Sequence, residues 1–218
     1  MKCYNCSKDF IKRELTKEHI PGQNLYIDFD SQHKKNRITV PACFICNNSY
    51  SKGDEELRNW LGTISELGQS NILTKKSVKS FLRHDPDFTR LVFNDQGKVI
   101  GTQYKKGDIN SAHIKNFKGL FYKQYGFPLP LDYKILPYYE NDRVELTGSI
   151  ISYLRTNFPW KYSGSPDIFQ YIIQPYVEVL PIKPFGDLPI DVEKDSQIIL
   201  AVFIYLNRLG VLIMAAKP

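Results

Sequence analysis

The feature that most constrains this chain is a pair of C-x-x-C motifs in its first fifty residues. Cys3 and Cys6 form the first motif, Cys43 and Cys46 form the second, and 36 residues lie between them. The two motifs use all four cysteines of the chain. Four thiolates are the ligand set of a closed tetrahedral zinc site. The spacing therefore predicts a structural zinc ion. A thioredoxin-like redox pair is the alternative, although a redox motif needs only one C-x-x-C.

A metal ion would also explain how these fifty residues fold. The segment is polar, lysine-rich and rich in turns, with short extended stretches expected at LYIDF and RITVPAC. So little apolar surface rarely sustains a fold alone, whereas structural zinc contributes about 10–16 kcal/mol in zinc-finger peptides. No secretory signal is visible, and the longest apolar run, Ile198 to Leu206, is too short for a membrane helix. We therefore expect a cytoplasmic protein without disulfides or membrane contact.

Charge is distributed unevenly along the 218 residues. Residues 1–84 carry 14 basic and 9 acidic side chains, whereas residues 85–218 carry 15 and 14. A basic first part favours a polyanionic partner such as nucleic acid, although solubility alone would also favour a charge of this size. With 42% hydrophobic residues, the chain can bury one or two cores.

Apolar spacing predicts three helices. The first covers residues 51–68, where Leu57, Trp60 and Leu61 fall on one face. A shorter helix is predicted at residues 74–84. The third is predicted at residues 108–125, beginning at Asp108 and ending before Gly126.

Alternating and turn-punctuated segments predict antiparallel strands. A hairpin is expected within residues 88–104, around a turn at residues 94–97. From Pro128 onward, repeated prolines predict short, aromatic-rich strands. The last two, at residues 197–206 and 211–216, are expected to form a buried hairpin. The fold class is therefore α+β.

A Glu-His pair and an asparagine lie close to the cysteine motifs. Glu18 and His19 precede a Pro-Gly turn, and Asn47 directly follows Cys46. Taken alone, such a histidine is most often a surface or structural residue. Closing the second cysteine motif, however, would bring Asn47 toward the segment that bears His19, so the three side chains are expected to converge beside a basic surface.

The order CYNC, TKEHIP and VPACFICNNSYSKGDEE resembles the HNH endonucleases, which have the ββα-metal fold. The resemblance covers residues 1 to about 60. It implies that His19 is the general base, and that Glu18 and Asn47 hold a catalytic Mg²⁺ or Mn²⁺ ion separate from the zinc. This chemistry suits the residue types, since a neutral histidine can take a proton from water and hard cations prefer oxygen ligands.

Two positions depart from the family's pattern. Ile38 stands where many relatives have an asparagine that orients the base, and Asn24 or Asn36 would have to substitute for it. Lys52 lies later than the family's lysine, which makes Asn48 and Glu55 further candidates for contacts with the metal or its ligands.

These patterns predict a zinc-stabilised ββα-metal (HNH) module at residues 1–70 and an α+β region of unknown role at residues 71–218. The module is expected to cut nucleic acid, with DNA favoured over RNA, although the sequence does not decide between the two. The second region would dock a protein partner or a second copy, for example in phage defence. A non-catalytic nucleic-acid-binding module is the alternative, and a protein-interaction domain is a third possibility. The expected phosphate-binding residues are Lys12, Arg13, Lys17, Lys34, Lys35, Arg37 and Lys52.

Overall fold

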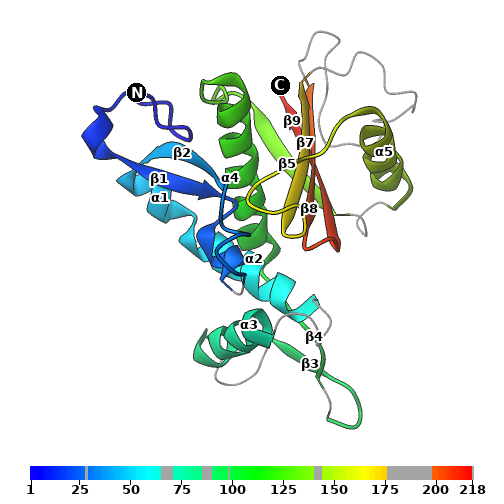
Figure 1. Cartoon of the computed structure of the whole chain (residues 1–218). Coiled ribbons are helices and arrows are strands. Elements are labelled where there is room, and N and C mark those ends of the chain that lie inside the picture. The colour runs from blue at the N-terminus through cyan, green and yellow to red at the C-terminus, as the bar shows by residue number, and fades with distance from the viewer. Residues whose placement is uncertain are drawn as a thin grey trace.

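A long central helix separates two β-containing parts of the molecule. The computed structural model describes residues 1–27, 29–64, 71–84, 90–97, 99–139, 144–175 and 198–217. In it, α4 (Lys106–Tyr125) has the N-terminal part on one side and a five-stranded sheet on the other (Figure 1). Among the described residues, no helix is long and apolar enough to cross a membrane.

The N-terminal part is built on a two-stranded antiparallel ribbon. Strand β1 (Leu15–Ile20) pairs with β2 (Ile38–Cys43), and the helices α1 (Phe44–Ser49) and α2 (Ser51–Ile64) follow. Two 3-10 helices flank β1, at Lys12–Glu14 and Gln23–Tyr26.

The extended stretch expected at RITVPAC is confirmed as β2, but the one expected at LYIDF is wrong. Leu25 and Tyr26 lie in a 3-10 helix and are both buried. The physical reason is that a strand would point one of two successive side chains away from the core. The 3-10 turn buries both.

A helical and hairpin segment extends from the end of α2. Helix α3 (Asn71–His84) packs on α2, and β3 (Leu91–Phe93) pairs with β4 (Val99–Thr102). The predicted helices at residues 51–68, 74–84 and 108–125 are confirmed where they are described, although α3 and α4 begin earlier than expected. The predicted end of the first helix, at residues 65–68, lies outside the described residues.

The five strands of the second part are all antiparallel, in the order β5-β9-β8-β7-β6. Their bounds are β5 (Lys134–Tyr139), β6 (Lys161–Tyr162), β7 (Phe169–Pro175), β8 (Ile198–Tyr205) and β9 (Leu209–Ala216). The predicted C-terminal hairpin is confirmed as β8 and β9. Its turn places Leu206 and Asn207 at positive φ angles of 51° and 55°.

The prediction that only strands follow Pro128 is wrong. Helix α5 (Val144–Asn157) lies in this stretch, in a segment without proline between Pro137 and Pro159. Ile150, Ile151 and Leu154 of this helix are buried, at helical spacing, in a core on the outer face of the sheet. The sheet therefore has α4 on one face and α5 on the other (Figure 1).

One core joins the two parts. It contains Ile20 and Val40 of the ribbon, Leu61 of α2, Phe117 of α4 and Ile213 of the sheet. Because this core includes residues on both sides of position 70, the division into residues 1–70 and 71–218 stays a prediction.

A buried serine also connects the sheet to the ribbon. The hydroxyl of Ser163, next to β6, donates a hydrogen bond to the carbonyl oxygen of Ile20 (2.5 Å) and accepts one from the backbone N–H of Ile38 (2.9 Å). Its carbonyl oxygen accepts a hydrogen bond from the Tyr26 hydroxyl (2.6 Å). Ser163 thus closes the end of the ribbon that lies next to His19.

Candidate metal centre and active site

The four cysteines come together as the spacing predicts. Their sulfur atoms all lie within 4.8 Å of one another. The Ser7 backbone, at a φ of 60°, turns the chain after Cys6, and the backbone N–H of Cys43 donates to the Cys3 sulfur (3.4 Å). This cluster is close enough to bind a metal ion, and its donor set suits a structural zinc ion.

The surroundings of the cluster affect its charge. Burial alone would raise the pKa of the Cys3 thiol, but hydrogen bonds from the backbone of Cys6, Cys43 and Asn5 outweigh it, and the pKa is lowered. Burial raises the pKa of Cys46 to about 12. The Lys118 ammonium of α4 donates to the Asn5 side chain (3.0 Å) and partly offsets the negative charge that the thiolates would carry.

The ribbon separates Glu18 from His19. Successive side chains of a strand point to opposite faces, and Glu18 is buried whereas Lys17 is exposed and His19 is half-buried. His19 pairs with Thr39 across the ribbon, two residues after Arg37. Lys17 and His19 therefore share the outer face, and Glu18 lies on the face that packs against α4.

His19 is available as a base. Among the described residues, its imidazole has no hydrogen-bond partner. Its pKa is lowered, first by partial burial and then by the positive charges of Arg37, Lys115 and Lys17. The imidazole is thus neutral around pH 7, where it can accept a proton.

The neighbouring Arg37 is partly engaged. Its Nε donates to the Lys34 carbonyl oxygen (3.1 Å), and its guanidinium carbon lies 5.5 Å from the centre of the Tyr26 ring. Its Nη1 atom is buried and has no hydrogen-bond partner among the described residues. The positive charge of Arg37 lies close enough to act on His19, whereas its Nη1 atom is shielded from solvent.

Glu18 belongs to a buried ionic cluster. Its Oε1 lies 3.3 Å from Nζ of the fully buried Lys115, which also lies 2.5 Å from Oδ2 of Asp54. Burial raises the pKa of both carboxyl groups, and the Lys115 charge opposes this. One ammonium therefore faces two carboxyl groups, and the cluster keeps a net negative charge when both are ionised. Oε2 of Glu18 remains buried without a hydrogen-bond partner among the described residues.

Asn47 is half-buried in α1, and among the described residues its side chain has no hydrogen-bond partner. Within the described part of the chain, the four cysteines are the one group of three or more His, Cys, Asp or Glu side chains close enough to share a metal ion. A hard cation at Glu18 would therefore need amide, water or phosphate oxygens for the rest of its coordination shell.

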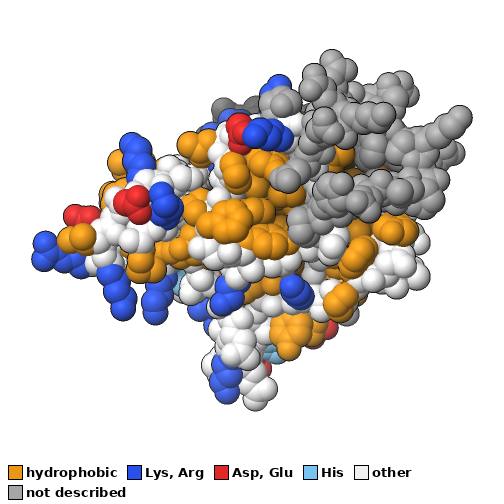
Figure 2. Space-filling view, turned by 90° about the horizontal axis from the view of Figure 1, so that it is seen from above, with side chains coloured by type: hydrophobic (Ala, Val, Ile, Leu, Met, Phe, Trp, Pro, Cys, Tyr) orange, Lys and Arg blue, Asp and Glu red, His pale blue; other side chains and the backbone are white. Residues whose placement is uncertain are grey.

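The basic residues expected to bind phosphate are spread over the surface. Lys52 forms an ion pair with Asp108 at the start of α4 (3.1 Å). Lys12, Arg13, Lys17 and Lys35 are exposed, and Lys34 and Arg37 are half-buried. Seen from above, lysine and arginine side chains project at separate points around hydrophobic side chains that gather in the middle of this face (Figure 2).

The other predicted contacts lie elsewhere. Glu55 accepts hydrogen bonds from Ser80 (2.7 Å) and Arg58 (3.3 Å), which places it toward α3. Asn48 donates to the Phe44 carbonyl oxygen (3.0 Å) within its own helix. Asn36 has a positive φ of 58°, and its carbonyl oxygen accepts a weak hydrogen bond from Gly164.

Sequence reasoning missed Lys115 and the role of Asp54. A signal for Lys115 was present, because it lies three residues after Ala112 and four before Gly119, on the buried side of α4. Gly119 packs so closely on Ile20 that a Cβ would collide with its side chain. Asp54 lies in the first turn of α2, and nothing local in the sequence indicated that it faces Lys115.

Comparisons of the chain with protein-family models, with curated proteins and with solved structures find no match. The resemblance to HNH endonucleases therefore rests on the motifs of the sequence.

Proposed function

We propose that the chain is a metal-dependent HNH-type endonuclease that hydrolyses phosphodiester bonds in DNA. The observation that carries this proposal is the unpartnered, neutral His19 on the outer face of a ribbon fixed by a four-cysteine cluster. The positive charges of Arg37 and Lys17 lie near it.

These residues suit the hydrolysis of a phosphodiester. His19 takes a proton from water, the water oxygen bonds to phosphorus, and the bond to the leaving 3′ oxygen breaks, after which that oxygen is protonated from solvent. Arg37 and Lys17 offset the negative charge that grows on the phosphate oxygens. Arg37 and Lys17 would contact the phosphate backbone of the DNA, so they would hold DNA without reading its base sequence.

A divalent cation would be held by Glu18 Oε2, the oxygen that Lys115 leaves unengaged, and by the amide oxygen of Asn47. When bound, it would supply Lewis-acid polarisation of a phosphate oxygen, and this role requires the Glu18 carboxylate to turn from the α4 face toward the face that bears His19. The orphaned carboxylate oxygen is the observation that supports such a ligand.

A non-catalytic nucleic-acid-binding module is the second candidate. The observation in its favour is the ion pair of Glu18 with Lys115, which already supplies a positive charge where a catalytic cation would bind. In this case His19, Lys17 and Arg37 would hold phosphate without activating water.

The deciding experiment is the cleavage of supercoiled plasmid with Mg²⁺, Mn²⁺ or EDTA. We expect divalent-dependent cleavage by the wild type and a loss of about 10²–10⁴-fold in His19→Ala, because a general base contributes about this much. His33→Ala is the matched control, since His33 lies in the neighbouring loop and is paired with Asp30 (2.7 Å). It should cut normally.

Zinc content and DNA affinity should be unchanged in His19→Ala. Equal cleavage by His19→Ala and the wild type would contradict the role of His19. No cleavage by a wild type that still binds DNA, with an affinity that falls steeply with salt, would favour the binding module instead.

The pH dependence of cleavage follows from the lowered pKa of His19. The base works when neutral, so cleavage should persist below the ordinary histidine pKa of about 6.5 and be lost as pH falls further. Arg37→Gln removes a positive charge and should raise the pKa of His19, which moves this acidic limb to higher pH. A limb that stays in place while cleavage slows would mean that Arg37 acts only on the substrate.

A further inference from the structure

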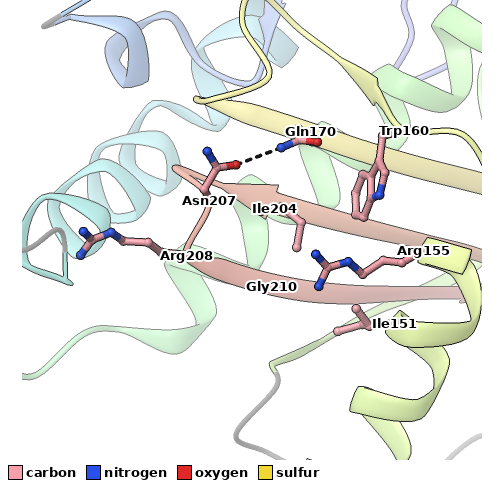
Figure 3. Close-up of a pocket in the computed structure, with 8 residues that line it drawn as sticks. All are labelled: Ile151, Arg155, Trp160, Gln170, Ile204, Asn207, Arg208 and Gly210. Atoms are coloured by element: carbon pink, nitrogen blue, oxygen red, sulfur yellow. Dashed lines mark hydrogen bonds between the residues drawn. The ribbon is translucent and has the colours of Figure 1, made fainter.

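A cavity of about 380 Å³ lies in the C-terminal part of the chain (Figure 3). Its walls come from α5, from the strands β7, β8 and β9, and from the turn between β8 and β9. The size falls in the range of small-molecule sites, about 300–1,000 Å³. Because α5 and the N-terminal ribbon lie on opposite sides of the sheet, this cavity is separate from His19 (Figure 1).

One side of the cavity offers a positive charge and an aromatic ring. The Arg155 guanidinium points between Trp160 and Ile151 (Figure 3), with its central carbon 5.9 Å from the centre of the Trp160 ring. Arg155 is exposed and has no ion pair among the described residues, and no carboxylate is among the described side chains of the lining. An arginine in this state binds phosphate or carboxylate oxygens well.

The opposite side offers amides above an apolar floor. Gln170 donates from Nε2 to Oδ1 of Asn207 (2.9 Å), which fixes the orientation of both side chains. The Oε1 atom of the Gln170 side chain has no hydrogen-bond partner among the described residues. Ile204 lies between the amides and the guanidinium, and Ile151 lies on the other side of Arg155 (Figure 3). Arg208 and Gly210 complete the lining.

We propose that this cavity binds a nucleoside phosphate. Arg155 would hold the phosphate, the base would stack against Trp160 over the isoleucines, and the Gln170 oxygen would accept a hydrogen bond from the base edge. A simple anion would contact Arg155 but would make no use of the Trp160 ring or of the Gln170 and Asn207 amides. The same chemistry is offered by a free mononucleotide and by the terminal nucleotide of a single strand.

Isothermal titration of the full-length wild type separates these sources. The probes are the mononucleotides AMP, GMP, CMP and UMP, a short single-stranded oligonucleotide with a 5′ phosphate, adenosine, and inorganic phosphate. We expect a nucleoside phosphate to bind about tenfold or more tightly than adenosine or phosphate alone, because adenosine lacks the phosphate for Arg155 and phosphate lacks the base for Trp160 and Gln170. Tighter binding of the oligonucleotide than of every mononucleotide, reduced in Arg155→Gln, would identify a strand end as the ligand.

Two variants test the assignment. Arg155→Gln and Trp160→Leu should each weaken binding by about tenfold or more, whereas Arg83→Gln, the same change on an exposed part of α3, should not. Thermal unfolding verifies that each variant is folded. His19→Ala should bind normally, which keeps this result independent of the proposed nuclease. Absence of binding at millimolar concentrations, or binding that survives Arg155→Gln, would overturn the proposal.

Discussion

Replacing Cys43 by serine is expected to abolish zinc binding by the cysteine cluster and to unfold the N-terminal part of the chain. Cys43 contributes one of the four sulfurs, its backbone N–H donates to the Cys3 sulfur, and it lies where β2 ends and α1 begins. Structural zinc contributes about 10–16 kcal/mol to small domains. This exceeds the whole stability of many proteins, about 5–15 kcal/mol. Metal analysis and hydrogen exchange of residues 1–50 measure the effect.

Comparison with Cys6→Ser shows whether the metal or the packing is responsible. Cys43 is buried and Cys6 is only half-buried, so a loss of packing would be clearly larger for Cys43. A shared metal predicts similar losses for both, because each variant removes one of four ligands. Chelation of the wild type should reproduce the effect, and added zinc should reverse it. A Cys6→Ser protein with full zinc content and unchanged exchange would contradict the four-thiolate site.

Lys115→Met is expected to destabilise the fold by about 3–5 kcal/mol, because it leaves two buried carboxylates without their counter-charge. Glu18 and Asp54 both depend on this ammonium. Methionine keeps most of the apolar stem of the side chain, so the loss reports the charge. Chemical denaturation measures it. Lys123→Met on the same helix is the matched control, since Lys123 is exposed and the change should have little effect.

The sign of the pH dependence provides a second test of this variant. Burial raises the pKa of Glu18 and Asp54, and removing Lys115 should raise both further. The folded variant then keeps protons that the unfolded chain has released. Its free energy of unfolding should therefore fall as pH rises above the ordinary carboxyl pKa of about 4, and the deficit relative to the wild type should shrink in acid. A deficit that is independent of pH would point to lost packing instead.

The elements that follow local rules were predictable from the sequence. Helix α2 and the β8–β9 hairpin have strong apolar patterns, and the cysteine pairs have a spacing that permits few other uses. In each case the pattern that made the prediction possible lies in residues close together in the sequence. Helix α5 was missed because its fold depends on the sheet that it covers, and Thr147 and Gly148 weaken its local helix preference.

The arrangement around Glu18 could not be read from local patterns. Glu18 and His19 are adjacent in the motif, but the alternation of side chains along β1 places them on opposite faces of the ribbon. The partner of Glu18 is 97 residues away in α4, so the fate of this carboxylate depends on tertiary packing. His19, Glu18 and Asn47 therefore remain proposed catalytic residues.

Residues 1–70 are a poor choice for expression as an isolated fragment, because they lack the contacts that Ser163 makes with the ribbon. The Ser163 hydroxyl binds Ile20 and Ile38, the residues that end one ribbon strand and start the other, directly beside His19. A fragment that ends before α4 would keep every residue of the HNH-like motif. It would lose the two hydrogen bonds of the Ser163 hydroxyl and the charge of Lys115. The smallest fragment that keeps these contacts thus extends at least to residue 163, well beyond the residues that resemble the HNH motif.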